Sequence, residues 1–188
     1  MKRIIFVTGN KYKFEIAQKA LKGTGVELIQ QKIETPEIQS TDVREIASFS
    51  ARYAARSLGK PVALTDAGWY ITALNGFPGP FIKFINQWLT SEEILKLMEG
   101  KKDRRVTIKG CLAYCEPNGE LITFSSQAIG SLSEKAVKTN KEENTSINEL
   151  FIPEGYNGRV ESEIPREEMI KYWAKVESYW EKLAGYLK

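Results

Sequence analysis

Apolar and polar positions alternate in blocks along the first two thirds of the chain, in a pattern that predicts strands alternating with helices. The expected strands span residues 3–8, 26–31, 61–66, 69–74, 104–115 and 121–129. The expected helices span residues 10–22, 42–58, 80–89, 91–98 and 165 almost to the end. Strands that alternate with helices early and form a hairpin later indicate an α/β protein with a mixed sheet and helices on both sides.

The last expected helix, which begins at Pro165, carries an apolar stripe at a-and-d spacing. The stripe consists of Met169, Trp173, Val176, Trp180, Leu183 and Leu187. It is interpreted as core or as a dimer face rather than as a ligand site.

Composition narrows the class of protein. The 188 residues suit one domain, residues 1–188, or two closely packed lobes, and 42% hydrophobic content supports a core. A formal charge of +3 is too small to indicate a nucleic-acid-binding protein. No apolar run is long enough to cross a bilayer, and the first residues do not resemble a signal peptide. We therefore expect a cytoplasmic protein without a membrane partner.

The sequence contains no histidine, which excludes acid–base chemistry and metal ligation by that residue. Cys111 and Cys115 are four residues apart on a predicted strand. That spacing separates them by roughly 13 Å, too far for a disulfide. Two buried thiols are expected.

The segment TGNKYK, residues 8–13, links the first predicted strand to the first helix. Free backbone N–H groups at a helix start favour an anion. Lys11 and Lys13 lie in the first turn, where the helix dipole disfavours cations, and a bound triphosphate would reverse that effect. The alternative is that Asn10 is a plain N-cap beside two solvated lysines.

Two acidic residues follow different predicted elements. Glu37 lies in TPEIQ, and Asp66 ends the apolar strand PVALTD. Two carboxylates together with substrate phosphates are sufficient for Mg²⁺. The alternative is a turn-forming Asp66 and a surface Glu37.

A further lysine, Lys83, follows the turn-rich segment GFPGPF.

These segments resemble the inosine triphosphate pyrophosphatases, the Ham1 family, in order and spacing over nearly the whole chain. VTGNKYKFE resembles the family's T-x-N-x-x-K signature, and TPEIQ resembles its P-E-x-Q segment. ALTDAGWYITALNGFPGPFIKF resembles a D-S-G-L stretch followed by G-x-P-G, and ELFIPEGY resembles a later segment.

The resemblance implies an elongated α/β fold with two lobes flanking a nucleotide cleft, a homodimer and Mg²⁺ as cofactor. It implies that Asp66 and Lys13 are catalytic, with Asp66 orienting or deprotonating the attacking water. It assigns Thr8, Gly9, Asn10 and Lys13 to the triphosphate, Glu37 and Asp66 to Mg²⁺, and Lys83, Asn148 and Lys175 to the nucleotide.

The chain departs from the family pattern where the family binds the base. The family's F-G-[YW]-D-P reads TSINE here, so that Ile147 replaces an aromatic residue and Asn148 an aspartate. The S-H-R motif is absent near Lys175, Thr65 replaces an acid, and Ser50 replaces a lysine. We therefore expect a nucleoside triphosphate pyrophosphatase with altered or relaxed base selectivity; the alternative is a weakly active or inactive nucleotide-binding paralogue.

Overall fold

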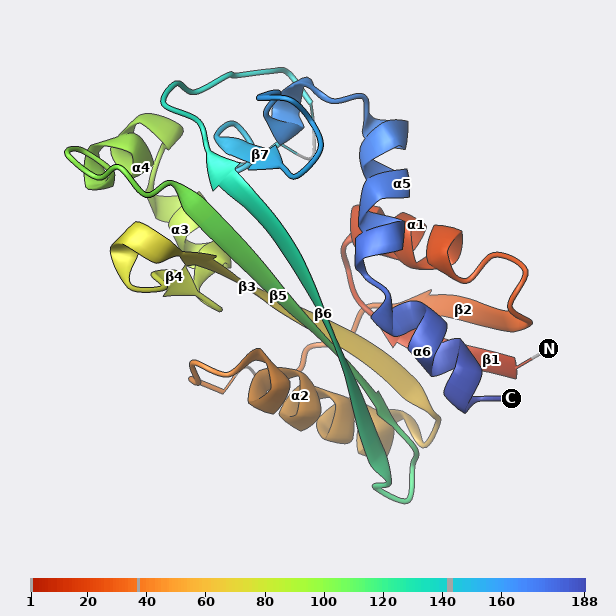
Figure 1. Ribbon diagram of the computed structural model, residues 1–188. Coiled ribbons are helices and arrows are strands. Elements are labelled where there is room, and N and C mark those ends of the chain that lie inside the picture. Colours follow the sequence, from red (N-terminus) through yellow and green to blue (C-terminus); the bar gives the residue numbers. More distant parts are fainter. Residues whose placement is uncertain (1, 37, 142–143) are drawn as a thin grey trace. The chain divides into compact units, whose positions relative to one another are not determined.

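The computed structural model describes residues 2–36, 38–141 and 144–188 (Figure 1). Its strands are β1 (Lys2–Val7), β2 (Val26–Gln31), β3 (Val62–Ile71), β4 (Pro78–Gly79), β5 (Arg105–Cys115), β6 (Leu121–Leu132) and β7 (Phe151–Pro153). Its α-helices are α1 (Lys11–Ala20), α2 (Val43–Leu58), α3 (Ile82–Trp88), α4 (Ser91–Leu97), α5 (Arg166–Val176) and α6 (Tyr179–Tyr186). Two short 3₁₀ helices, η1 (Thr72–Leu74) and η2 (Glu161–Glu163), complete the described elements.

The strands of the described chain form one mixed sheet in the order β2-β1-β3-β5-β6-β7, with β4 paired to β3. β1 pairs in parallel with both β2 and β3, whereas β3 with β4 and β6 with β7 are antiparallel. This arrangement confirms the predicted α/β class with a mixed sheet.

The chain divides into two compact units, which we describe separately. The first unit contains Met1–Ala67, Gly110–Ser126 and Ile170–Lys188. The second contains Gly68–Lys109 and Gln127–Met169. None of the helices in the described residues is long and apolar enough to cross a bilayer.

The core of the first unit has two layers because strand side chains point alternately to opposite faces. Ile4 and Phe6 of β1 pack with α1 and α6, in a cluster that includes Ala17 and Trp180. Ile5 and Val7 pack with α2, in a cluster whose helical members are mostly alanines. Helices therefore cover both faces of the sheet in this unit, as predicted (Figure 1).

The helix boundaries in the first unit follow from local chemistry. Asn10 caps α1 by accepting a hydrogen bond from the Lys13 amide. Asp42 caps α2 in the same way, and Gly59 ends α2 in the left-handed conformation that glycine adopts without strain.

The predicted C-terminal helix is wrong in one respect, because it is two helices. α5 ends at Val176 and α6 begins at Tyr179, with Glu177 and Ser178 between them. The Trp180 amide donates to the Glu177 carbonyl, and the Ser178 amide donates to the Val176 carbonyl. Within the stripe, Met169, Trp173, Trp180 and Leu183 are buried, which confirms its assignment to the core.

The predicted break between separate strands at 61–66 and 69–74 is also wrong, because β3 is one continuous strand. A Cβ atom at Gly68 would lie 2.9 Å from the Tyr70 hydroxyl oxygen and 3.0 Å from the backbone of Gly79. Glycine here permits a close approach of neighbouring groups and does not form a turn. The predicted separate strand at 69–74 is the end of β3 followed by η1.

Aromatic side chains of the second unit pack against one another. Trp69 and Phe151 meet edge to face, with ring centroids 4.8 Å apart.

The predicted helix at Pro80 begins two residues later, at Ile82, and α4 is stabilised by a capping box between Thr90 and Glu93.

Gly130 of β6 is expected to tolerate no side chain. A Cβ atom there would lie 2.4 Å from the Ile152 carbonyl oxygen and 2.4 Å from the Phe151 ring. We expect Gly130→Ala to lower the free energy of unfolding by about 2 kcal/mol, as overpacking does. The matched control is Gly185→Ala in α6, where nothing lies within 4 Å; it is expected to raise stability by about 0.5 kcal/mol. Urea unfolding of both variants is the measurement, and equal midpoints would contradict the prediction.

Candidate active site

The turn between β1 and α1 presents the start of a helix at the carboxyl end of a parallel strand. The Asn10 side chain accepts from the Lys13 amide at 3.1 Å, and the Asn10 amide donates to the Thr8 hydroxyl at 3.1 Å. Gln30 of β2 donates to the Thr8 carbonyl at 3.3 Å. The first turn of α1 contains no acidic residue. The turn therefore combines a fixed backbone with the positive end of a helix dipole.

Lys32 adds a cation at this turn that the sequence analysis did not select. Its side-chain carbons lie 3.1–3.5 Å from the position that a Cβ atom on Gly9 would occupy. Lys32 directly follows β2, and the register pairs Val7 with Gln31 at the end of both strands. That register was the signal that could have found it, since parallel neighbours end at the same edge of the sheet.

Glu177, between α5 and α6, is a carboxylate that was not predicted. The half-buried Glu177 side chain accepts from the Trp180 indole N–H at 3.2 Å. Burial raises the pKa of Glu177, while the Tyr179 hydroxyl and the positive charge of Lys13 act to lower that pKa.

The negative charge of Asp66 contributes to raised pKa values of two other groups in the first unit, Cys111 and Tyr179. Burial raises the pKa of Cys111 to about 11; Arg44 opposes that shift, and the charges of Asp42 and Asp66 add to it. Burial also raises the pKa of Tyr179, and the charges of Glu177 and Asp66 add to that increase. The Oδ2 atom of Asp66 is itself buried.

The other predicted ligands lie in different places. Lys175 is exposed in the last turn of α5, in the first unit. Lys83 is exposed at the start of α3, in the second unit. In the same unit the Asn148 side chain accepts from the Thr145 hydroxyl at 2.7 Å. The predicted Mg²⁺ ligand Glu37 lies outside the described residues.

Ile147, where the family places an aromatic residue, is part of the core of the second unit. It is 1% exposed, and its amide donates to the Asn86 side chain at 3.2 Å. A side chain buried in this way presents no face on which a base can stack.

Comparison with known proteins decides the family. The family model described as the Ham1 family matches residues 4–176. This chain belongs to the Ham1 family. Residues 4–176 include the β1–α1 turn, Asp66 and the whole of α5.

Curated relatives share much of the chain of this Ham1 protein. A protein named dITP/XTP pyrophosphatase from Methanopyrus kandleri is 39% identical over 153 residues, which covers 81% of this chain and 80% of that protein. A protein of the same name from Methanosarcina mazei is 44% identical over 133 residues and covers 71% and 72%.

Solved structures agree with the fold. A HAM1 protein from Coxiella burnetii has a TM-score of 0.79 at 22% identity and covers 100% of this chain and 98% of that one. The Ham1 protein of Staphylococcus aureus has a TM-score of 0.75 at 18% identity and covers 99% and 98%. At these identities the likeness establishes the fold.

The donor set of this Ham1 protein fits Mg²⁺ bound mainly through substrate. Among the residues that the structure describes, no group of three acidic, cysteine or histidine side chains could hold a metal alone. Mg²⁺ is commonly held by one or two carboxylates together with phosphate oxygens and water. Asp66 supplies a carboxylate of this kind.

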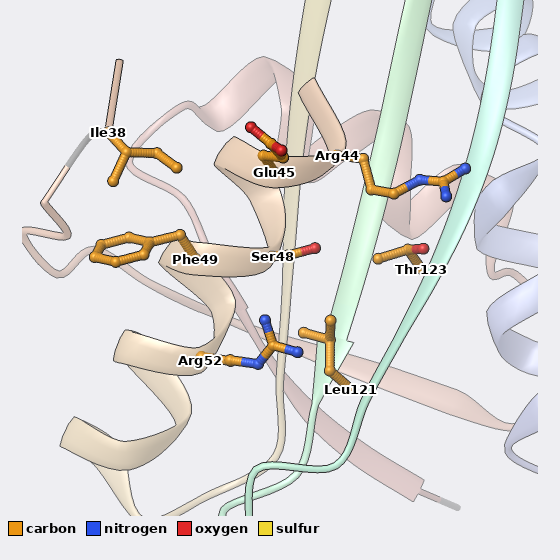
Figure 2. Close-up of a pocket in the computed structure, with 8 residues that line it drawn as sticks. All are labelled: Ile38, Arg44, Glu45, Ser48, Phe49, Arg52, Leu121 and Thr123. Carbon is orange, nitrogen blue, oxygen red and sulfur yellow. The ribbon is translucent and has the colours of Figure 1, made fainter. Parts of the chain in front are cut away.

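A separate pocket of the first unit, with a volume of about 460 Å³, lies beside α2 (Figure 2). It is lined by Ile38, Arg44, Glu45, Ser48, Phe49, Arg52, Leu121 and Thr123. Figure 2 shows Arg44 extending toward Thr123 of β6, while Phe49 points away from that strand. Among the residues that the structure describes, none of the predicted site residues lines this pocket.

Proposed function

We propose that this Ham1 protein hydrolyses nucleoside triphosphates to the monophosphate and pyrophosphate, and that noncanonical purine nucleotides are among its substrates. The observation that carries the proposal is the β1–α1 turn. An acid-free helix start lies there, with Lys13 in its first turn, and Asn10 fixes the backbone by accepting a hydrogen bond from the Lys13 amide at 3.1 Å. The names of the curated relatives agree with this activity.

In the proposed reaction, Thr8, Gly9 and Asn10 hold the triphosphate through backbone and side-chain donors, and Lys13 neutralises its charge. A water oxygen forms a bond to the α-phosphorus while the bond from that phosphorus to the α,β-bridging oxygen breaks. Asp66 orients the water and accepts its proton, and pyrophosphate leaves. Mg²⁺, when bound by Asp66 and Glu37 with the phosphates, would supply charge neutralisation.

The direct test is pyrophosphate release from ITP, XTP, GTP, ATP and a pyrimidine triphosphate, with Mg²⁺ and with excess chelator. We expect activity that requires the metal, and a difference in kcat/KM between bases of about 10–100-fold. When the wrong base leaves buried polar groups of a site unpaired, the site can discriminate between bases by about 10⁴–10⁵-fold in kcat/KM. The buried Ile147 and the hydrogen-bonded Asn148 are poorly suited to such a site.

Two outcomes of this panel contradict parts of the proposal. A preference for ITP and XTP of several orders of magnitude would show that other residues form a selective purine pocket. Binding of triphosphates without any pyrophosphate release would favour the inactive paralogue.

The nucleotide cleft, the homodimer and the cytoplasmic location stay predictions. Aromatic side chains around α3 are exposed, with Trp88 at 71%, and a subunit interface would cover such residues. Light scattering of the purified protein would measure its oligomeric state.

A further inference from the structure

The pocket beside α2 is formed by one face of that helix and one face of β6. Arg44, Ser48 and Arg52 follow one another at intervals of four residues, so that their side chains share a face of α2. Leu121 and Thr123 are two residues apart on β6 and therefore point to the same side of that strand. Both segments belong to the first unit. The pocket is thus built on regular secondary structure, which holds side chains more precisely than a loop does.

Two cations of this pocket have no acidic partner in the part of the chain that the structure describes. Neither Arg44 nor Arg52 forms an ion pair there. By contrast, Arg3, Arg105 and Lys138 each pair with a carboxylate. Figure 2 shows both guanidinium groups of the pocket extending toward β6. A guanidinium is a planar fork of N–H donors that matches a phosphate, so the two arginines together favour an anion at this face.

The rest of the pocket combines apolar surface with one acceptor. Ile38, Phe49 and Leu121 line it, and the ring of Phe49 is 43% exposed. The Glu45 carboxylate accepts from the Ser40 hydroxyl at 2.7 Å, which holds it in place. A carboxylate can accept further hydrogen bonds, so Glu45 also suits a ligand that carries hydroxyl or N–H groups. A simple anion would use only the arginine part of this pocket.

We propose that this pocket binds a nucleoside monophosphate, at a site separate from the β1–α1 turn. The phosphate of such a ligand carries a charge of about −1.5 to −2 at pH 7, which the two guanidinium groups balance. Its base offers a planar face to Phe49, and its ribose hydroxyls are donors for Glu45. A volume of about 460 Å³ lies within the range of about 300–1,000 Å³ of small-molecule sites. A triphosphate carries more negative charge than two arginines neutralise.

The test is isothermal titration calorimetry of the full chain with AMP. We expect Arg44→Gln and Arg52→Gln each to weaken AMP binding by about tenfold, the effect of a lost hydrogen bond to a charged group. Arg56→Gln is the matched control, because Arg56 is an exposed arginine of the same helix and is not among the described residues that line the pocket. The control is expected to change the affinity by less than about twofold. Equal weakening by all three substitutions, or no saturable binding of AMP to the wild type, would overturn the proposal.

Two fragments of the ligand test its chemical class. Inorganic phosphate lacks the base, and adenosine lacks the charge, so we expect each to bind at least about tenfold more weakly than AMP. Phe49→Ala is expected to weaken AMP binding by about tenfold, the size of a lost base–aromatic contact, and to leave phosphate binding unchanged. Phosphate that binds as tightly as AMP would overturn the proposal by showing an anion site without a place for the base.

The same titrations in a Lys13→Ala background separate this pocket from the β1–α1 turn. AMP is the product of ATP cleavage in the proposed reaction, so binding at the turn has to be distinguished. We expect AMP binding and its dependence on Arg44 and Arg52 to persist in this background. Loss of AMP binding there would assign the ligand to the turn and overturn the proposal. A wild type that binds AMP through the arginines but releases no pyrophosphate would instead refute the proposed function and support this site.

Discussion

Replacing Asp66 with asparagine is expected to lower kcat for pyrophosphate release by about 10²–10⁴-fold, the contribution of a positioned acid–base group. The amide is a poor ligand for Mg²⁺ and takes no proton from water. Because asparagine has nearly the same shape, the buried site should keep its packing. Steady-state pyrophosphate release with saturating Mg²⁺ is the measurement, with circular dichroism to verify the fold.

Asp103→Asn is the matched control for this variant. Hydrogen bonds from Arg105 lower the pKa of Asp103 to about 2, so that it is an ionised aspartate outside the predicted site. We expect the control to keep the wild-type kcat. If Asp66→Asn also keeps the wild-type kcat, Asp66 is neither the general base nor a required metal ligand.

Much of the first unit could be predicted because its elements are specified locally. The apolar run of β1, the cap at Asn10 and the run of β2 each depend on a few adjacent residues. Gly59 at the end of α2 is a local signal of the same kind, and its left-handed φ of 61° agrees with it. Elements of this type require no knowledge of the partner against which they pack.

The two errors in the predicted elements arise from contacts distant in sequence. Gly68 resembles a turn residue until Tyr70 and Gly79 are seen to approach it. The a-and-d stripe of the C-terminal segment predicts a continuous helix, because Trp173 and Trp180 are both apolar and correctly spaced. The break between them is accompanied by hydrogen bonds from Trp180 to Glu177, and the stripe pattern carries no information about them.

The candidate site shows the same division. Thr8, Asn10 and Lys13 were predicted from a motif of six residues, and their mutual hydrogen bonds lie within that motif. Lys32 approaches this turn from the residue that follows β2. Lys32 belongs to no local motif, and it is the parallel register of β1 with β2 that brings it to this turn.

Replacing Lys13 with alanine is expected to raise KM for triphosphates by about 10–100-fold. A hydrogen bond between charged groups contributes about 1.5–3 kcal/mol, which corresponds to this range. Backbone donors of the turn remain in the variant because Asn10 still accepts from the amide of residue 13. The measurement is kcat and KM for ITP and for ATP at one fixed concentration of Mg²⁺.

Lys11→Ala is the control that makes this prediction specific. Lys11 has the same charge and lies in the same helical turn, but it is exposed, whereas Lys13 is half-buried. If the turn attracts triphosphate only through its net charge, both substitutions will raise KM equally, and raising the salt concentration will remove both effects. If Lys13 is oriented onto the phosphates, Lys11→Ala will change KM by less than about threefold, as a screened surface charge does. The Lys13 effect will then be the same for ITP and ATP, because the two substrates share the triphosphate and differ only in the base.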